Sequence, residues 1–145
     1  MTARTHAICA AVTLVVLLFT GLAAQGKRVA AAESWVKLPS PGETRAMAFV
    51  AIENPTMYGI YVTTATSNAA AKVELHDAGL SGDAREKPVE FISVPAYDRV
   101  DMRPGGLHLL LIDLKRPLKE GDTVALTLST DNAGTLEVAA IVRKE

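Results

Sequence analysis

Cysteine is almost missing from this sequence. The only one among 145 residues is Cys9, which lies near the start of an apolar N-terminal run. A single cysteine cannot form an intramolecular disulfide, and it also excludes a thiolate metal cluster. We therefore expect packing alone to hold the domain together.

An excess of charge of either sign is also lacking. The whole chain has 15 basic and 16 acidic residues, a formal charge of −1. Without Arg4, Lys27 and Arg28, which belong to the N-terminal segment, 12 basic residues stand against 16 acidic ones and the charge is −4. Proteins that bind nucleic acids need a basic surface, so nucleic acid is not an expected partner.

Catalytic motifs are missing too. No serine lies in a G-x-S-x-G context, no glycine-rich phosphate loop opens a helix, and no stretch after the N-terminal run predicts a helix of three turns. Asp98, Asp101 and Asp113 lie near expected turns or strand ends, where carboxylates are ordinarily solvated. The sequence therefore predicts a protein that is not an enzyme.

The one long apolar run is at the N-terminus. Arg4 precedes it, residues 7–19 are apolar, and small residues follow. This order is typical of a secretory signal, so we predict that residues 1–32 comprise a signal peptide and a short spacer. The protein is then periplasmic or secreted. Cleavage is expected near Ala24, Gln25 or Glu33.

A second interpretation of this run is an uncleaved anchor. Residues 7–24 approach the ~20 apolar residues that a membrane-spanning helix needs, and Lys27 and Arg28 follow it as positive flanking charges. A membrane is an expected partner only in this case. Lipid attachment is not expected, because Cys9 lies within the start of the run and not after it.

Residues 33–145 contain short strand-like runs at regular spacing. The runs cover residues 35–38, 47–52, 58–66, 71–76, 89–94, 97–102, 107–112, 124–128 and 136–142. Run 47–52 is apolar throughout, which predicts a strand buried on both faces, and run 58–66 is its expected hairpin partner. The pattern predicts a single-domain, all-β antiparallel sandwich or barrel of about eight or nine strands.

Two histidines remain in residues 33–145, each in a strand-like run. His108 directly follows a glycine turn at residues 104–106 and shares one strand face with Leu110. His76 ends an alternating run, on the polar side with Glu74. Taken alone, His108 is ordinarily explained as a hydrogen-bonded core or rim residue and His76 as a solvated surface residue.

Four motifs together resemble a known family. They are IENP at residues 52–55, VELHD at 73–77, RPGGLHLLL at 103–111 and LKRPLKEGDTVALTL at 114–128. They are similar to the periplasmic copper chaperones of the PCuAC type over nearly the whole of residues 33–145. The resemblance implies a cupredoxin-like Greek-key β-barrel that carries copper. It also implies cytochrome oxidase assembly proteins as partners.

The resemblance also implies a ligand set, which this sequence alters. In the PCuAC family two histidines and two methionines hold Cu(I). His76 and His108 match the histidines, whereas Leu110 and Glu86 stand at the methionine positions. Leucine cannot ligate, and glutamate is a hard ligand that suits Cu(II) or Zn(II), whereas thioethers select Cu(I). The expected cargo is a copper ion, as Cu(I) or Cu(II).

Three interpretations of this site stay open. In the first, His76 and His108 bind copper and Glu86 or a water completes the site. The second, in which a methionine from elsewhere is a ligand, is described below. In the third, the protein keeps the fold as an interaction module and binds no metal tightly. The set His76, Glu86 and His108 also matches the ligand types of a catalytic zinc site, but no general base accompanies it.

The second interpretation recruits a methionine from elsewhere in the chain. Met102 lies six residues before His108, across the glycine turn, and Met47 and Met57 are further candidates. Methionine more commonly fills irregular apolar gaps in a core, so each of them also has a purely structural explanation.

Overall fold

The computed structural model describes residues 26–79 and 87–145, and these residues contain ten strands. The strands are β1 (Ala30–Lys37), β2 (Arg45–Asn54), β3 (Ile60–Ser67), β4 (Ala70–Asp77), β5 (Lys87–Pro88), β6 (Ile92–Val94), β7 (Asp98–Asp101), β8 (Leu107–Leu114), β9 (Thr123–Thr130) and β10 (Thr135–Arg143). The all-β prediction is confirmed. These residues include no apolar helix of membrane-spanning length.

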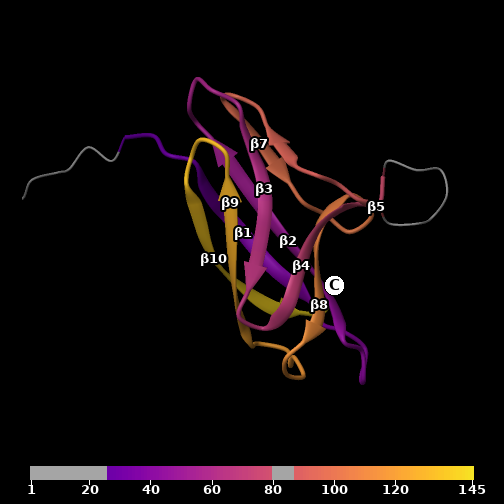
Figure 1. Ribbon diagram of the computed structural model, residues 1–145. Coiled ribbons are helices and arrows are strands. Elements are labelled where there is room, and N and C mark those ends of the chain that lie inside the picture. Colours follow the sequence, from indigo (N-terminus) through magenta and orange to yellow (C-terminus); the bar gives the residue numbers. More distant parts are fainter. Residues whose placement is uncertain (1–25, 80–86) are drawn as a thin grey trace, which may run out of the picture.

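Seven of the strands close into a barrel (Figure 1). The hydrogen-bonded order around it is β4, β8, β2, β1, β10, β9 and β3, and β3 pairs back with β4 through Ala65 and Val73. The first and last strands of the barrel, β1 and β10, run parallel, with Trp35 opposite Ile141. The three short strands extend the barrel wall: β5 pairs with β4, β6 with β3 and β7 with β2.

The interior of the barrel is aliphatic. β2 and β8 contribute Val50, Ile52, Leu109 and Leu111, each of them at most 1% exposed. The other barrel strands contribute further buried aliphatic side chains: Val36, Ile60, Val62, Val124, Leu126, Leu128, Val138, Ala140 and Val142. Burial of this much apolar surface stabilises the barrel, as the lack of disulfides requires.

The outward side of β2 and β8 is buried as well. Phe49 alternates with the interior residue Val50, and His108 alternates with Leu109, yet Phe49 and His108 are each only 1% exposed. A strand that is covered on both faces has an almost continuous apolar sequence. The prediction that residues 47–52 are buried on both faces is therefore confirmed.

Strand pairing differs from the prediction at β3. We expected β3 to form a hairpin with β2, but β3 pairs with β4, β6 and β9, and β2 pairs with β1, β7 and β8. The hairpin prediction is wrong because the connection between β2 and β3 crosses an end of the barrel. The predicted run 89–94 contributes only β6, while β5 precedes it, so the strands number ten.

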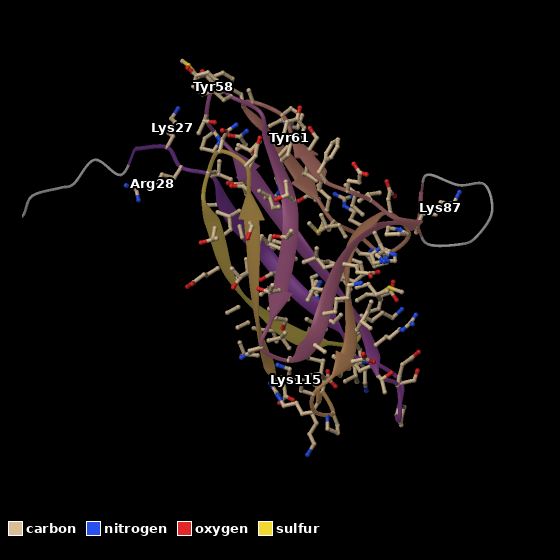
Figure 2. All side chains as sticks on the ribbon, viewed as in Figure 1. Lys27, Arg28, Tyr58, Tyr61, Lys87 and Lys115 are labelled. Carbon is tan, nitrogen blue, oxygen red and sulfur yellow. The ribbon has the colours of Figure 1, made fainter. Side chains whose placement is uncertain are left out.

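Asn54 ends β2 and fixes this crossing. Its buried side chain donates hydrogen bonds to the carbonyls of Tyr58 (2.8 Å) and Pro95 (3.0 Å), which belong to two different loops. A buried amide must be hydrogen-bonded, so Asn54 holds both loops in place. Figure 2 shows Tyr58 and Tyr61 at this end of the barrel, with Lys115 at the opposite end.

β1 begins before the predicted domain start at residue 33. Ala30 pairs with Glu53 and Ala31 with Ile52, so residues 30–32 belong to the barrel. Cleavage immediately before Glu33 would remove this part of β1, whereas cleavage near residue 24 or 25 would leave the strand whole. Residues 1–25, and with them the predicted signal peptide, lie outside the described residues.

Candidate metal centre

A tight turn leads the chain into β8. The Gly106 amide donates to the Arg103 carbonyl over 3.0 Å, with Pro104 and Gly105 between them. Gly105 has φ +82°, so this is a type II turn, in which proline favours the first central position and glycine the second. His108 follows two residues after the turn.

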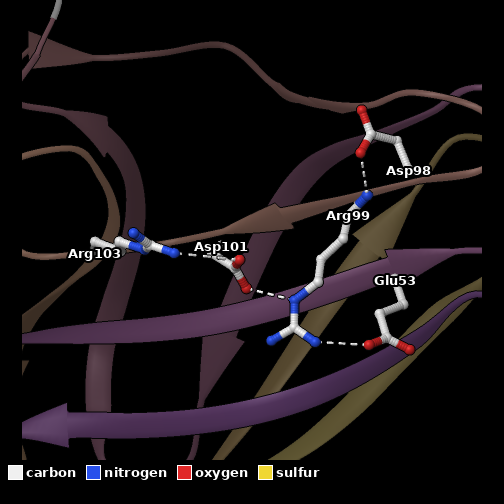
Figure 3. A network of polar contacts seen from close by, with 5 residues as sticks. All are labelled: Glu53, Asp98, Arg99, Asp101 and Arg103. Atoms are coloured by element: carbon white, nitrogen blue, oxygen red, sulfur yellow. Dashed lines mark hydrogen bonds and ion pairs between the residues drawn. The ribbon is translucent and has the colours of Figure 1, made fainter.

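Ionic contacts hold β7 on β2 just before this turn (Figure 3). Arg99 Nε donates to Asp101 over 2.6 Å and its Nη1 donates to Glu53 over 2.6 Å. The Asp101 and Glu53 carboxylates raise the pKa of Arg99 above its ordinary value, Asp101 most strongly. Arg103, the first residue of the turn, lies 3.6 Å from Asp101. The network therefore helps to fix the entry to the turn.

The two predicted histidine ligands lie opposite each other on adjacent strands. β4 and β8 pair with His76 directly facing His108. Their ring centroids are 5.7 Å apart, with 38° between the ring planes. His76 is 6% exposed and His108 is 1% exposed. Two rings separated by 31 residues in sequence thus meet on the outward face of the barrel wall.

This separation fits a shared metal ion. An ion about 2.0–2.1 Å from one nitrogen of each ring lies roughly 3.2 Å from both centroids, so the centroids can be at most about 6.4 Å apart. The observed 5.7 Å meets that limit.

A backbone carbonyl sets the orientation of the His108 ring. Its Nδ1 lies 2.9 Å from the Gly106 carbonyl oxygen, which also accepts a bond from the Ala78 amide over 3.1 Å. A carbonyl cannot donate, so the proton of this bond is on Nδ1, and the neutral ring then has its lone pair on Nε2. Metal-binding histidines are typically oriented by such a bond from the other ring nitrogen.

A carboxylate does the same for His76. Its Nε2 lies 2.9 Å from Glu74 Oε2. The hydrogen bonds from His76 and from Lys72 lower the pKa of Glu74 below its usual 4.5, so Glu74 is ionised at neutral pH and accepts the proton of Nε2. The neutral ring then has its lone pair on Nδ1. Glu74 was not predicted as part of the site, although its position two residues before His76 places both on one strand face.

A row of rings continues from the histidines across the outward face of the barrel. The centroid of Phe49 lies 6.3 Å from that of His108, and the Trp35 centroid lies 4.6 Å from that of Phe49. Arg143 stacks on Trp35, 4.3 Å from the ring centroid. The row crosses β10, β1, β2, β8 and β4 in their order around the barrel. It covers the side of the histidine pair that faces β2.

Comparison with known proteins identifies the family. The model of the family described as "Putative lipoprotein LpqE-like" matches residues 29–142. The chain belongs to this LpqE-like family. A relative from Leifsonia xyli subsp. xyli (strain CTCB07), named "Putative lipoprotein Lxx21020", is 31% identical over 121 residues, which are 82% of this chain and 72% of that protein.

Solved structures similar to this LpqE-like chain include PCuAC domains. The copper-bound PCuAC domain from PmoF2 superimposes with a TM-score of 0.70 at 25% identity, covering 81% of this chain and 94% of that domain. The solution structure of CuI-DR1885 from Deinococcus radiodurans gives a TM-score of 0.69 at 32% identity, covering 84% and 83%. The prediction of a cupredoxin-like barrel is confirmed, as is the similarity to PCuAC domains.

The other predicted ligands of the LpqE-like chain do not gather at the histidines. Met102 is 5% exposed and belongs to the interior core, while Met57 is 62% exposed in the loop after β2. Glu86 lies outside the described residues. Within residues 26–79 and 87–145, histidine, cysteine, aspartate and glutamate form no metal-capable group of three or more.

The environment of His76 differs from its prediction. Its strand face is the predicted one, shared with Glu74, but the ring is buried and not solvated. The reason is its cross-strand neighbour, because the His108 ring and the paired β8 backbone cover it. Alternation within one strand cannot reveal such a neighbour.

Proposed function

We propose that this protein binds a copper ion between His76 and His108 and acts as a copper carrier. The observation that supports this most directly is the pair of facing imidazoles with centroids 5.7 Å apart. Neutral imidazole is a good copper ligand, and the hydrogen bonds to Glu74 and Gly106 fix the tautomers, so that in the neutral rings the lone pairs are on Nδ1 of His76 and Nε2 of His108. The similarity to a copper-bound PCuAC domain supports the same cargo.

We propose a carrier and not an enzyme, exported from the cytoplasm. Copper is then the cargo, received and released by ligand exchange. The lipoprotein names of the family and its relative, together with the apolar run of residues 7–24, support export to the periplasm. The proposed recipients are cytochrome oxidase assembly proteins, which the PCuAC resemblance implies.

The proposed site is altered relative to the PCuAC pattern. Leu110 is on the strand face of His108 and offers no donor atom, and Glu86 is the proposed replacement at the other methionine position. Because carboxylate oxygen is a harder ligand than thioether sulfur, Glu86→Met is expected to raise the affinity for Cu(I) relative to that for Cu(II). An equal preference in both forms would remove Glu86 from the site.

A second candidate function is an interaction module that binds no metal tightly. The burial of both rings favours it, since His76 is 6% and His108 1% exposed. Buried histidines with one nitrogen bonded to Glu74 or Gly106 can be structural residues.

Competition titration of the full chain with Cu(I) and Cu(II) separates the two functions. The carrier is expected to bind one copper ion per chain. The double variant His76→Asn/His108→Asn is expected to lose at least about 100-fold in copper affinity, because mutation of the residues that only hydrogen-bond to metal ligands already costs about 10–100-fold. Tyr58→Asn, at a 69% exposed position in the loop after β2, is the control. A wild-type protein that binds no copper would refute the carrier and support the interaction module. Copper affinity that is equal in wild type and double variant would refute the carrier with these two ligands.

The pH dependence gives an independent check on the same ligands. Imidazole must be neutral to bind a metal, so protons compete with copper. Copper affinity is therefore expected to fall steadily as the pH is lowered, because protonated imidazole cannot bind the ion. Affinity that is independent of pH between 5 and 8 would exclude both imidazoles as ligands.

A further inference from the structure

A second row of side chains lies beside the histidine row on the outward face. In the first row, His108 faces His76, with Phe49 next along the sheet. Two residues further along β8, Leu110 pairs with Glu74 on one side and with Met47 on the other. Since side chains alternate along a strand, Met47, Leu110 and Glu74 share the face of the histidines.

Met47 is thus a diagonal neighbour of His108. Such neighbours on adjacent strands are about 7–8 Å apart and remain within reach of long side chains. Met47 is half-buried, and together with Leu110 it lines a hollow of about 310 Å³. The other residues that line the hollow belong to 37–46, and neither histidine lines it. The reach of Met47 toward the ion therefore depends on the three rotatable bonds of its side chain.

The two other methionines of the described residues do not share this position. Met102 is 5% exposed, and the residue before it, Asp101, pairs with the outward residue Ala51, so alternation places Met102 on the inward side. Met57 is 62% exposed in the loop between β2 and β3. Met47 is therefore the methionine that the register places beside the histidine pair.

We propose that Met47 is a third copper ligand, through its thioether sulfur. This inference rests on the proposed function, because it assumes that His76 and His108 hold the ion. A thioether is a soft ligand that selects Cu(I) over Cu(II). The site then consists of two imidazole nitrogens and one sulfur, with Glu74 positioning the His76 ring. The Met47 sulfur consequently raises the affinity for Cu(I) relative to that for Cu(II).

Affinity measurements on Met47→Leu in the full chain test this proposal. Leucine keeps the volume and removes the sulfur, so the fold is expected to be preserved. The Kd for Cu(I) is expected to rise at least about tenfold, by the loss of a ligand, while the Kd for Cu(II) changes less than about twofold. Met57→Leu is the matched control and is expected to leave both constants unchanged. A Met47→Leu protein that binds Cu(I) as the control does would overturn the proposal.

X-ray absorption spectroscopy gives a second test that does not depend on variant stability. The full chain is prepared with selenomethionine and loaded with Cu(I), and the copper and selenium edges are recorded. A copper–selenium distance near 2.3–2.5 Å is expected, comparable to metal–sulfur bonds of ~2.3 Å, and it is expected to vanish in Met47→Leu. A copper shell of nitrogen and oxygen only would refute Met47 as a ligand.

The two levels of the proposal fail in different ways. If copper binding is unaffected in His76→Asn/His108→Asn, the proposed function is refuted. If binding depends on the histidines but shows no selenium neighbour and no effect of Met47→Leu, only the role of Met47 is refuted. In that case the site is completed by other ligands, and the copper carrier stands.

Discussion

Near the middle of β2 and β8, residues on the inward and outward faces are both buried but differ in chemistry. Val50, Leu109 and Leu111 point into the barrel and contribute only hydrocarbon, whereas Phe49 and His108 point outward and are covered by neighbouring side chains. An aliphatic interior tolerates substitutions of similar volume. The outward face depends on ring orientation and on specific hydrogen bonds, such as that of His108 to Gly106. Burial alone therefore does not separate the residues that hold the fold from those proposed to hold the cargo.

The largest effect on stability is expected from a substitution on the inward face. Leu111→Ala leaves a cavity at a fully buried position, and such changes cost about 2–5 kcal/mol of unfolding free energy. Copper affinity measured at a temperature where the variant is folded is expected to stay within about twofold of wild type. Chemical denaturation and copper titration measure the two quantities. A large loss of affinity in the folded variant would show that the two faces are not independent.

An outward substitution is expected to change both quantities. Phe49→Leu removes the aromatic ring next to His108. It is expected to cost about 1–2 kcal/mol of unfolding free energy, less than Leu111→Ala, because leucine fills part of the volume of phenylalanine. The His108 ring loses a neighbour that restricts it, so copper affinity is expected to fall several-fold. The same denaturation and titration are measured as for Leu111→Ala. Unchanged copper affinity in Phe49→Leu would mean that the row only supports the fold.

Glu74→Gln tests the hydrogen bond behind His76. Because Glu74 has a lowered pKa in the folded protein, its carboxylate contributes stability above the unfolded value of about 4.5, and this contribution is lost as the pH falls through the lowered pKa. Glu74 is partly exposed, so the expected difference from wild type is at most about 1 kcal/mol at pH 7. Copper affinity is expected to fall about tenfold.

A pH series tests whether the hydrogen bond between Glu74 and His76 causes the stability difference between wild type and Glu74→Gln. Denaturation of wild type and Glu74→Gln between pH 7 and pH 3 is expected to show curves that converge at the acidic end. A stability difference that persists below pH 3 would come from packing and not from the carboxylate.

The smallest effect is expected where the outward face opens to solvent. Ile141 lies opposite Trp35 on β10 and is 55% exposed. Ile141→Thr keeps a β-branched side chain, so stability is expected to change by no more than about 0.5 kcal/mol. Copper affinity is expected to equal that of wild type. A larger loss in either quantity would extend the functional part of the face as far as β10.

Much of the fold could be predicted from sequence periodicity. The apolar run at residues 47–52 and the alternation at residues 71–76 correctly indicate strands, and the proline and glycines at 104–106 indicate the turn before β8. The partners of those strands could not be predicted in the same way. The expected hairpin between β2 and β3 is wrong because the connection between them crosses an end of the barrel. Asn54 holds this connection through hydrogen bonds to two loop carbonyls, one of them 41 positions away.

The candidate site was only partly predictable for the same reason. The motifs around His76 and His108 single out both residues, but their meeting depends on the register of β4 against β8. The positions of Met47 and Phe49 also follow from pairing across strands, which no single run contains. Glu74 is the exception, since its spacing from His76 already places it on the same face.

The parallel pairing of β1 with β10 has a consequence for how the barrel forms. Residues 35–37 meet residues 141–143, so the wall cannot be completed until almost all of the described chain is present. Contacts between such distant segments carry a large loop-closure entropy and slow the folding reaction. A nascent chain of this sequence is therefore expected to stay open until its last strand has been synthesised.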